Sequence, residues 1–172
     1  GVTFPIGLAY MTAMLLRKDY EVRMLDPIAE RIPISRIHDS ARWSDAIIMP
    51  FSVSHMDDTK KFRLNFRDKF FILGGGYSKF VPDMLFDGDY CDAILNGEPE
   101  KTIVELMDSF PSIENVAGII YKKNGRVVIA PSRPLIENLD ELPFPERGLL
   151  NPSLYWDISF YGLPTAWILP AR

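Results

Sequence analysis

The chain has 172 residues, 47% of them hydrophobic, and its formal net charge at pH 7 is −4. This length allows one well-buried core with an appendage, but not two ordinary domains joined by linkers. The acidic balance leaves no basic stripe for a phosphate backbone, so we expect no nucleic-acid partner.

The single cysteine fits a reducing compartment, and the hydropathy indicates no membrane span. Cys91 is the single cysteine and cannot form an internal disulfide. No stretch approaches the roughly 20 apolar residues that a membrane span requires. The first residues, GVTFPIGLAY, lack an initiator Met and the pattern of a secretion signal. We therefore expect a cytoplasmic protein and interpret the sequence as a piece of a longer chain.

The first part of the chain predicts alternating helices and strands. Residues 6–17 are apolar over most of a helix surface, which predicts a buried helix. Residues 20–27 (YEVRMLDP) alternate apolar and charged side chains and end in a turn-forming Asp-Pro pair, which predicts a strand. We expect a helix over 34–43. The continuous apolar run within residues 45–54 is typical of a strand that is covered on both faces.

The alternation then continues through a helix over 57–65, a strand over 69–75, a short helix over 82–86, a strand within 90–96 and an amphipathic helix over 100–110. This order predicts an α/β fold: a three-layer, Rossmann-like (flavodoxin-like) parallel sheet with helices on both faces. Such sheets begin with a strand that becomes central, whereas this chain begins on a helix. We therefore expect the first strand to be missing, which leaves an open edge beside the strand at 45–54 for self-association of the fragment.

The pattern changes after Pro111. Residues 116–130 (VAGIIYKKNGRVVIA) form two alternating runs around Asn124 and Gly125, a strong signal for a β-hairpin at the edge of the sheet. Residues 131–172 hold seven of the fourteen prolines and have little periodicity, which indicates an extended linker. We thus predict an α/β domain over 1–116, its edge hairpin over 117–130 and the linker over 131–172.

Small residues follow three of the predicted strands. Ligands of an open parallel sheet bind over the carboxyl ends of its strands, and three stretches fall at such ends: FSVS, GGGYS and NGEP. Hydroxyl groups and bare backbone there could form one rim that admits a large, flat or extended ligand and donates hydrogen bonds to it. The alternative, that the glycines only turn the chain and the serines cap a helix, is equally open.

We expect the substitution Gly75→Val to distinguish these two interpretations of the glycines. If the glycine admits a ligand, the valine should block binding and leave the fold largely intact. If the glycine is needed for a positive φ, the valine should destabilise the protein by roughly 1 kcal/mol or more.

The rim stretches belong to a longer pattern. The segments FPIGLAYMTAML, YEVRMLD, ILGGGYSKFVPDML, CDAILNGEPEKTIVELM, VAGIIYKKNGRVV and RPLIENLDELPFPERGLL follow one another over nearly the whole chain. In order and spacing this pattern resembles the N-terminal cobalamin (B12)-binding domain of B12-dependent radical SAM enzymes. That family includes the magnesium-protoporphyrin IX monomethyl ester oxidative cyclase and many methyltransferases.

The resemblance implies cobalamin as the cofactor of this domain. Its binding residues would be those of the rim, some of them along the nucleotide tail of the cofactor: Ser52, Ser54, Gly74, Gly75, Gly76, Tyr77, Gly97 and Glu98. In cobalamin domains of the methionine-synthase kind, the loop before the first helix supplies a histidine to the cobalt. The corresponding loop here, GVTFPIG, contains no histidine, so we expect no such cobalt ligand from it.

The resemblance also implies a downstream radical SAM domain, absent from this chain, that would hold a 4Fe-4S cluster and S-adenosylmethionine. We expect that the fragment alone is not catalytic, with no catalytic or metal-binding residues of its own. The parent protein would be a radical SAM oxidoreductase of the cyclase or methyltransferase type. The alternative is an α/β domain of the same kind that has lost cobalamin and serves as a docking or structural module.

Other candidate residues are better explained without a function. His55 follows a predicted strand, but a lone histidine is more often hydrogen-bonded or solvent-facing than a ligand. Cys91 has no nearby histidine or second cysteine to activate it and is expected to be a small buried hydrophobe, so we propose no nucleophile. A nucleotide-binding Rossmann enzyme would require the motif G-x-G-x-x-G after its first strand, and this sequence does not contain that motif.

Overall fold

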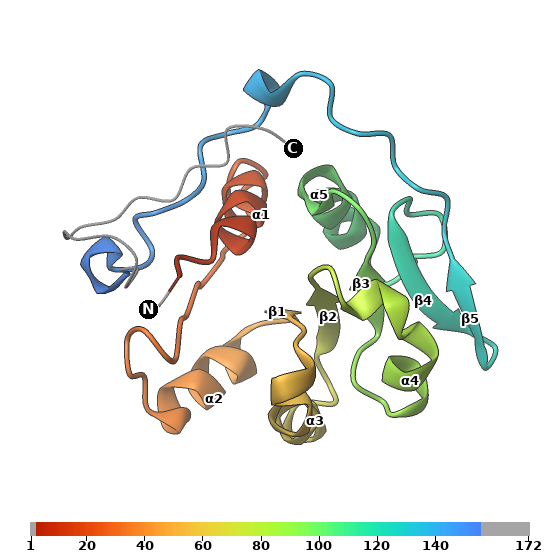
Figure 1. Ribbon diagram of the computed structural model, residues 1–172, viewed down its shortest axis with the longest axis horizontal. Helices are drawn as coiled ribbons and strands as arrows, with labels where there is room; N and C mark the ends of the chain where they lie inside the picture. The colour runs from red at the N-terminus through yellow and green to blue at the C-terminus, as the bar shows by residue number, and fades with distance from the viewer. Residues whose placement is uncertain (1–2, 156–172) are drawn as a thin grey trace. The chain divides into compact units, whose positions relative to one another are not determined.

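The computed structural model describes residues 3–155 of the chain (Figure 1). It contains two compact units. One consists of Gly1–Ser40 together with Asp140–Arg172, and the other consists of Ala41–Leu139. The second unit therefore forms from one continuous stretch of chain, whereas the first combines the N-terminal residues with residues that follow Leu139.

The second unit is built on a five-stranded sheet with the order β1-β2-β3-β4-β5. The strands are β1 (Ala46–Pro50), β2 (Phe70–Gly74), β3 (Ala93–Leu95), β4 (Ile119–Lys123) and β5 (Arg126–Ile129). β1, β2 and β3 are parallel to one another, while β4 runs antiparallel to both β3 and β5. The predicted open α/β sheet is confirmed, and the hairpin makes it mixed rather than wholly parallel.

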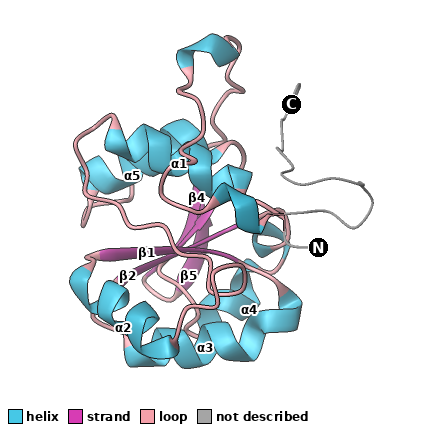
Figure 2. Cartoon of the chain, turned by 90° about the vertical axis from the view of Figure 1, so that its left-hand side faces the viewer, coloured by secondary structure: helices cyan, strands magenta, loops and turns pink. Residues whose placement is uncertain are grey.

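Helices cover both faces of this sheet. α3 (Met56–Asn65) and α4 (Pro82–Asp87) lie on one face, and α5 (Pro99–Ser109) lies on the other (Figures 1 and 2). α3 connects β1 to β2, and α4 connects β2 to β3. Because both right-handed crossovers move along the sheet in the same direction, they place the two helices on the same face. The predicted three-layer arrangement is thus confirmed within this unit. α2 (Ile34–Trp43), also predicted, spans the boundary between the two units.

The hairpin forms where the sequence predicts it. Asn124 and Gly125 have φ angles of 50° and 78°, as a two-residue turn with positive φ at both positions requires. They join β4 and β5, whose register pairs Lys123 with Arg126.

The predicted strand over residues 20–27 is wrong. Residues 20–26 form no helix or strand, and the five-stranded sheet contains no strand from this segment. The alternating side chains suit a strand, but a strand also requires a neighbour for its backbone groups. The expected Asp-Pro turn does form, because Asp26 Oδ1 accepts hydrogen bonds from the amides of Ile28 (3.1 Å) and Ala29 (2.9 Å).

In the first unit, part of the predicted linker packs against N-terminal residues. α1 (Ile6–Leu16) is confirmed as a largely apolar helix. Its residues and neighbours share a core with the C-terminal segment, made of Phe4, Ala9, Met24, Leu150 and Tyr155. The amide of Glu146 donates to the carbonyl of Ala9 (3.0 Å), and the Tyr155 hydroxyl donates to Asp26 Oδ2 (3.1 Å). The described part of residues 131–172 is irregular apart from two short 3-10 turns, Leu139–Glu141 and Pro152–Leu154.

The central strand β2 holds the core of the second unit. All five of its residues are buried, and three of them, Phe71, Ile72 and Leu73, have no exposed surface. A cluster of apolar side chains surrounds Leu73, consisting of Phe51, Leu85, Phe86, Cys91, Ile94 and Ile120. This burial on both faces explains the continuous apolar run of the β2 sequence.

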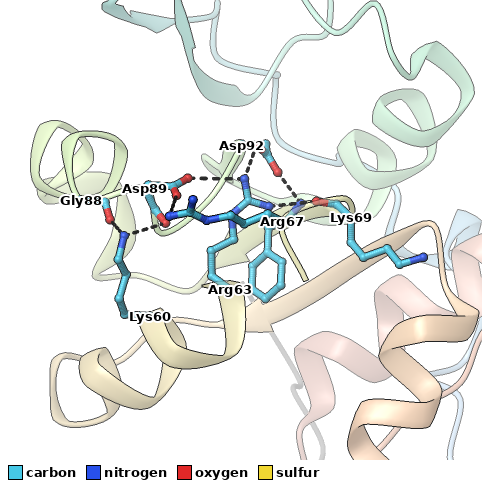
Figure 3. Close-up of polar contacts among 8 residues, drawn as sticks. Lys60, Arg63, Arg67, Lys69, Gly88, Asp89 and Asp92 are labelled. Atoms are coloured by element: carbon cyan, nitrogen blue, oxygen red, sulfur yellow. Dashed lines mark hydrogen bonds and ion pairs between the residues drawn. The ribbon is translucent and has the colours of Figure 1, made fainter. Parts of the chain in front are cut away.

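A buried arginine joins α3 to β2 and β3. The Arg63 side chain is 6% exposed, and its guanidinium donates to Asp92 Oδ1 at 2.8 Å and to the carbonyl of Lys69 at 2.9 Å (Figure 3). Asp92, just before β3, also accepts a hydrogen bond from the Phe71 amide through Oδ2 at 2.7 Å. One ion pair therefore connects the helix to the starts of two neighbouring strands.

The loop before β3 is held to α3 by further polar contacts. Asp89 lies 3.6 Å from Arg63 and 3.3 Å from Arg67. Lys60 Nζ donates to the carbonyl of Gly88 and, at 3.2 Å, to the carbonyl of Asp89 (Figure 3). This helix face therefore fixes the path of the chain from α4 into β3.

The difference in burial between two arginines of α3 gives a stability test. Arg63→Ala should lower the free energy of unfolding by about 2 kcal/mol, because it removes the buried member of an ion pair whose other member, Asp92, is 34% exposed. Arg67→Ala is the control: its side chain is 63% exposed, and exposed pairs contribute only about 0.5 kcal/mol. Urea unfolding followed by circular dichroism measures both variants. Equal losses would contradict the anchoring role of Arg63.

Candidate functional site

The loops that leave β1, β2 and β3 emerge at the same edge of the sheet. The register pairs Pro50 with Gly74, and the Phe51 amide donates to the Gly74 carbonyl (2.8 Å), so the ladder continues one residue beyond β1. On the other side, a Cβ on Gly74 would lie 3.6 Å from Leu95 Cδ1, at the end of β3. The predicted rim therefore exists as a feature of the backbone.

The rim residues differ in exposure. Gly74 is buried at the end of β2, below the rim, and Glu98 is half-buried. The remaining predicted residues are exposed, namely Ser52, Ser54, Gly75, Gly76, Tyr77 and Gly97.

The backbone conformation explains why glycine occurs at some positions of the rim but not at others. Gly75 and Gly97 have φ angles of +100° and +99°, a conformation that side chains other than glycine rarely adopt. Gly75→Val would therefore strain the backbone whether or not a ligand binds, and it cannot separate the two interpretations of the glycines. Gly76 lies outside this region of φ, and a Cβ there would meet nothing within 4 Å. Neither backbone conformation nor crowding explains the glycine at position 76.

The two serines do not cap a helix through their side chains. Ser52 precedes the 3-10 turn Val53–His55 but makes no side-chain capping bond. Its hydroxyl instead lies 2.8 Å from the hydroxyl of Ser54. The capping interpretation is thus wrong for Ser52, and the pair places two exposed hydroxyl groups side by side on the rim.

Exposed apolar side chains accompany these polar groups. Tyr77, Val53 and Phe80 are 56%, 53% and 72% exposed, in the segments that follow β1 and β2. Val53 and Phe80 are not among the residues predicted from the sequence. The signal that could have found them is the presence of large apolar residues just beyond strand ends, where no core position is expected.

Glu98 has a partner within the fold. It precedes α5 without capping that helix through its side chain. Its Oε2 accepts a hydrogen bond from the Ile136 amide at 2.7 Å. The carboxylate is therefore directed toward residues after the hairpin.

The other candidates have ordinary environments. His55 is exposed at the end of the turn before α3. Burial, reinforced by the charge of Asp92, raises the pKa of the Cys91 thiol, which disfavours the reactive thiolate. Within residues 3–155, no group of three or more His, Cys, Asp or Glu side chains is placed to hold a metal ion. Across the same residues, no helix is long and apolar enough to cross a membrane.

An open α/β sheet with parallel strands at its centre and helices on both faces belongs to the Rossmann-like class of folds, whose ligands commonly bind over the carboxyl ends of the strands. No family model matches the sequence.

Individual proteins do match. The sequence is 34% identical over 178 residues to the uncharacterized methyltransferase PH0819 of Pyrococcus horikoshii, covering 98% of this chain and 38% of that protein. It is 35% identical over 92 residues to the anaerobic magnesium-protoporphyrin IX monomethyl ester cyclase of Rubrivivax gelatinosus, covering 49% of this chain and 16% of that protein.

A solved structure shares the fold. The radical S-adenosylmethionine methyltransferase TsrM from Kitasatospora setae, with cobalamin and a [4Fe-4S] cluster bound, superposes with a TM-score of 0.65 and 15% identity. The match covers 87% of this chain and 29% of that one. Together these matches confirm the resemblance to the B12-binding domain of B12-dependent radical SAM proteins. This chain spans less than two-fifths of each of these proteins.

The environment of Cys91 predicts slow thiol chemistry. In the native chain at pH 8, Ellman's reagent should react with Cys91 at least about a hundredfold more slowly than in denaturing urea, because reaction requires opening of the core. Absorbance at the wavelength of the released thiolate measures both rates. Reaction of the native chain at the denatured rate would show that Cys91 is not buried.

Proposed function

We propose that this chain is the cobalamin-binding domain of a B12-dependent radical SAM protein and that the cofactor binds at the rim. The observation that carries the proposal is Gly76. It is an exposed glycine beside open space, at a strand end, with a backbone conformation that other residues tolerate. A ligand that lies against the backbone is a physical reason for the absence of a side chain there.

The chemistry of the rim fits the proposed cofactor. Cobalamin carries amide side chains and a phosphodiester in its nucleotide tail, and both present hydrogen-bond acceptors. The hydroxyls of Ser52 and Ser54 are exposed donors. Tyr77 adds an exposed aromatic surface, while Gly75 and Gly97 leave backbone accessible. A few polar groups beside apolar surface are typical of cofactor sites.

The proposal extends to the whole protein. The relatives are longer than this chain, and TsrM was solved with a [4Fe-4S] cluster. We infer that residues 131–172 lead toward a radical SAM domain that would hold such a cluster and S-adenosylmethionine. The reaction would be of the methyltransferase or oxidative cyclase type, in the cytoplasm, with the present chain binding cobalamin but not catalytic alone.

Titration with hydroxocobalamin tests the proposed function. The 172-residue chain should change the visible spectrum of hydroxocobalamin in a saturable, stoichiometric manner. Absence of any spectral change or co-elution at saturating concentrations would contradict the proposal and favour the alternative of a docking or structural module.

Substitutions at Gly76 test where the cofactor binds. Gly76→Leu should weaken hydroxocobalamin binding about tenfold or more, because overpacking a ligand site costs roughly 1–3 kcal/mol. The melting temperature should change little, since no protein atom outside the neighbouring residues of the chain lies within 4 Å of the added Cβ. Gly76→Ala should have a smaller effect on binding.

Ser112→Leu is the matched control for these variants. Ser112 is exposed and lies near Phe110, whose ring packs on Phe70 at the start of β2, at the opposite edge of the sheet. The substitution Ser112→Leu therefore introduces a leucine side chain away from the rim and should leave hydroxocobalamin binding unchanged. Equal binding by Gly76→Leu and Ser112→Leu would contradict a site at the rim.

A further inference from the structure

We propose that Glu98 is a positioning residue that fastens residues 131–136, here called the strap, to the rim, so that ligand binding and strap position are coupled. This inference rests on the proposed function for its ligand. The strap leaves β5 and runs past α5 within the same unit (Figure 1). The carboxylate would act through the backbone and not by contact with the cofactor.

The first contact between rim and strap is the Glu98 carboxylate. Glu98 occupies the N-cap position of α5, where a short polar side chain would accept a hydrogen bond from an amide of the first turn. Glu98 makes no such side-chain bond, and its Oε2 accepts from the Ile136 amide, 38 residues along the chain, at 2.7 Å. The Ile136 side chain is buried. The strap is therefore anchored at its end by one charge-assisted hydrogen bond and one apolar contact.

The second contact joins the strap to the first turns of α5. Arg133 Nε donates to Thr102 Oγ1 at 3.1 Å, and the Arg133 guanidinium also pairs with Glu105. Thr102 is fully buried, and its hydroxyl donates to the Glu98 carbonyl at 3.4 Å. Glu98 is thus connected to the strap through its side chain and, by way of Thr102, through its backbone.

The third contact fixes the start of the strap. The Gly118 amide donates to the Pro131 carbonyl at 2.9 Å, and the Asn96 amide donates to the Gly118 carbonyl at 2.8 Å. A Cβ on Gly118 would lie 2.7 Å from Thr102 Oγ1, so only glycine fits there without displacement. Asn96 immediately precedes the exposed Gly97 of the rim.

These contacts enclose the rim loop between strap and helix. Asn96 and Glu98 flank Gly97, and both are tied to the strap directly or through Gly118. If the fastened strap favours the loop conformation that binds ligand, then ligand must favour the fastened strap by the same factor. The residues that follow the strap would thereby respond to occupancy of the rim.

Glu98→Ala and Glu98→Gln test the coupling in the 172-residue chain. Amide hydrogen exchange of Ile136, followed by NMR, reports the fastening, and hydroxocobalamin titration reports binding. Glu98→Ala should speed Ile136 exchange about tenfold and weaken hydroxocobalamin binding about tenfold, as expected for loss of a hydrogen bond to a charged group. Glu98→Gln keeps an acceptor oxygen, so Ile136 exchange should remain slow and most of the hydroxocobalamin affinity should be preserved. Hydroxocobalamin should slow Ile136 exchange in the wild type.

Glu137→Ala is the control, because it removes the same charge from an exposed position next to Ile136 and should change neither measurement. Unchanged Ile136 exchange in Glu98→Ala would overturn the fastening. This holds even if the variant loses hydroxocobalamin binding, because the loss would then come from direct contact between Glu98 and the cofactor. Faster exchange with unchanged binding would overturn the coupling. If the wild type does not bind hydroxocobalamin, the proposed function fails and the coupling with it, while the exchange rates still decide whether Glu98 fastens the strap.

Discussion

The sheet of the second unit depends on the interaction of the Arg63 guanidinium with Asp92 and the Lys69 carbonyl. A buried charge is tolerated when the protein provides partners for it, and here Asp92 and the Lys69 carbonyl accept from the two terminal nitrogens of the guanidinium. Asp92 also holds the Phe71 amide, so one ion pair sets the helix, the start of β2 and the start of β3. Fixing parallel strands at one edge also determines where their other ends lie, and those ends carry the rim.

The two edges of the sheet differ in how their polar groups are used. At the starts of the strands, charged side chains and carbonyls are engaged with one another. At the carboxyl ends, the Ser52 and Ser54 hydroxyls contact each other and are exposed, and Gly76 faces open space. Contacts within the fold therefore explain the residues at the first edge, and positive φ angles explain Gly75 and Gly97 at the second, but neither explains Gly76 or the exposed serine hydroxyls. Glu98 is the exception, since its carboxylate serves the fold.

Local signals predicted most of the fold, and features that depend on distant partners were missed. The hairpin follows from Asn124 and Gly125 alone, because two adjacent residues set the turn. Residues 20–27 had the alternation of a strand, but pairing requires a neighbouring strand that the segment itself does not specify. The sequence placed Glu98 at the rim but could not show that its partner is Ile136. Nor could it distinguish Gly75, which needs positive φ, from Gly76, which does not.

The most direct test of cobalamin binding at the rim is amide NMR of the 172-residue chain during addition of hydroxocobalamin. The account predicts that the largest shift changes fall on the amides of Ser52, Ser54, Gly75, Gly76 and Gly97. Smaller changes should extend to Ile136 through Glu98, and the amides around Arg63 at the opposite edge should be unaffected. Spectra that do not change, or changes centred on the starts of the strands, would contradict the account.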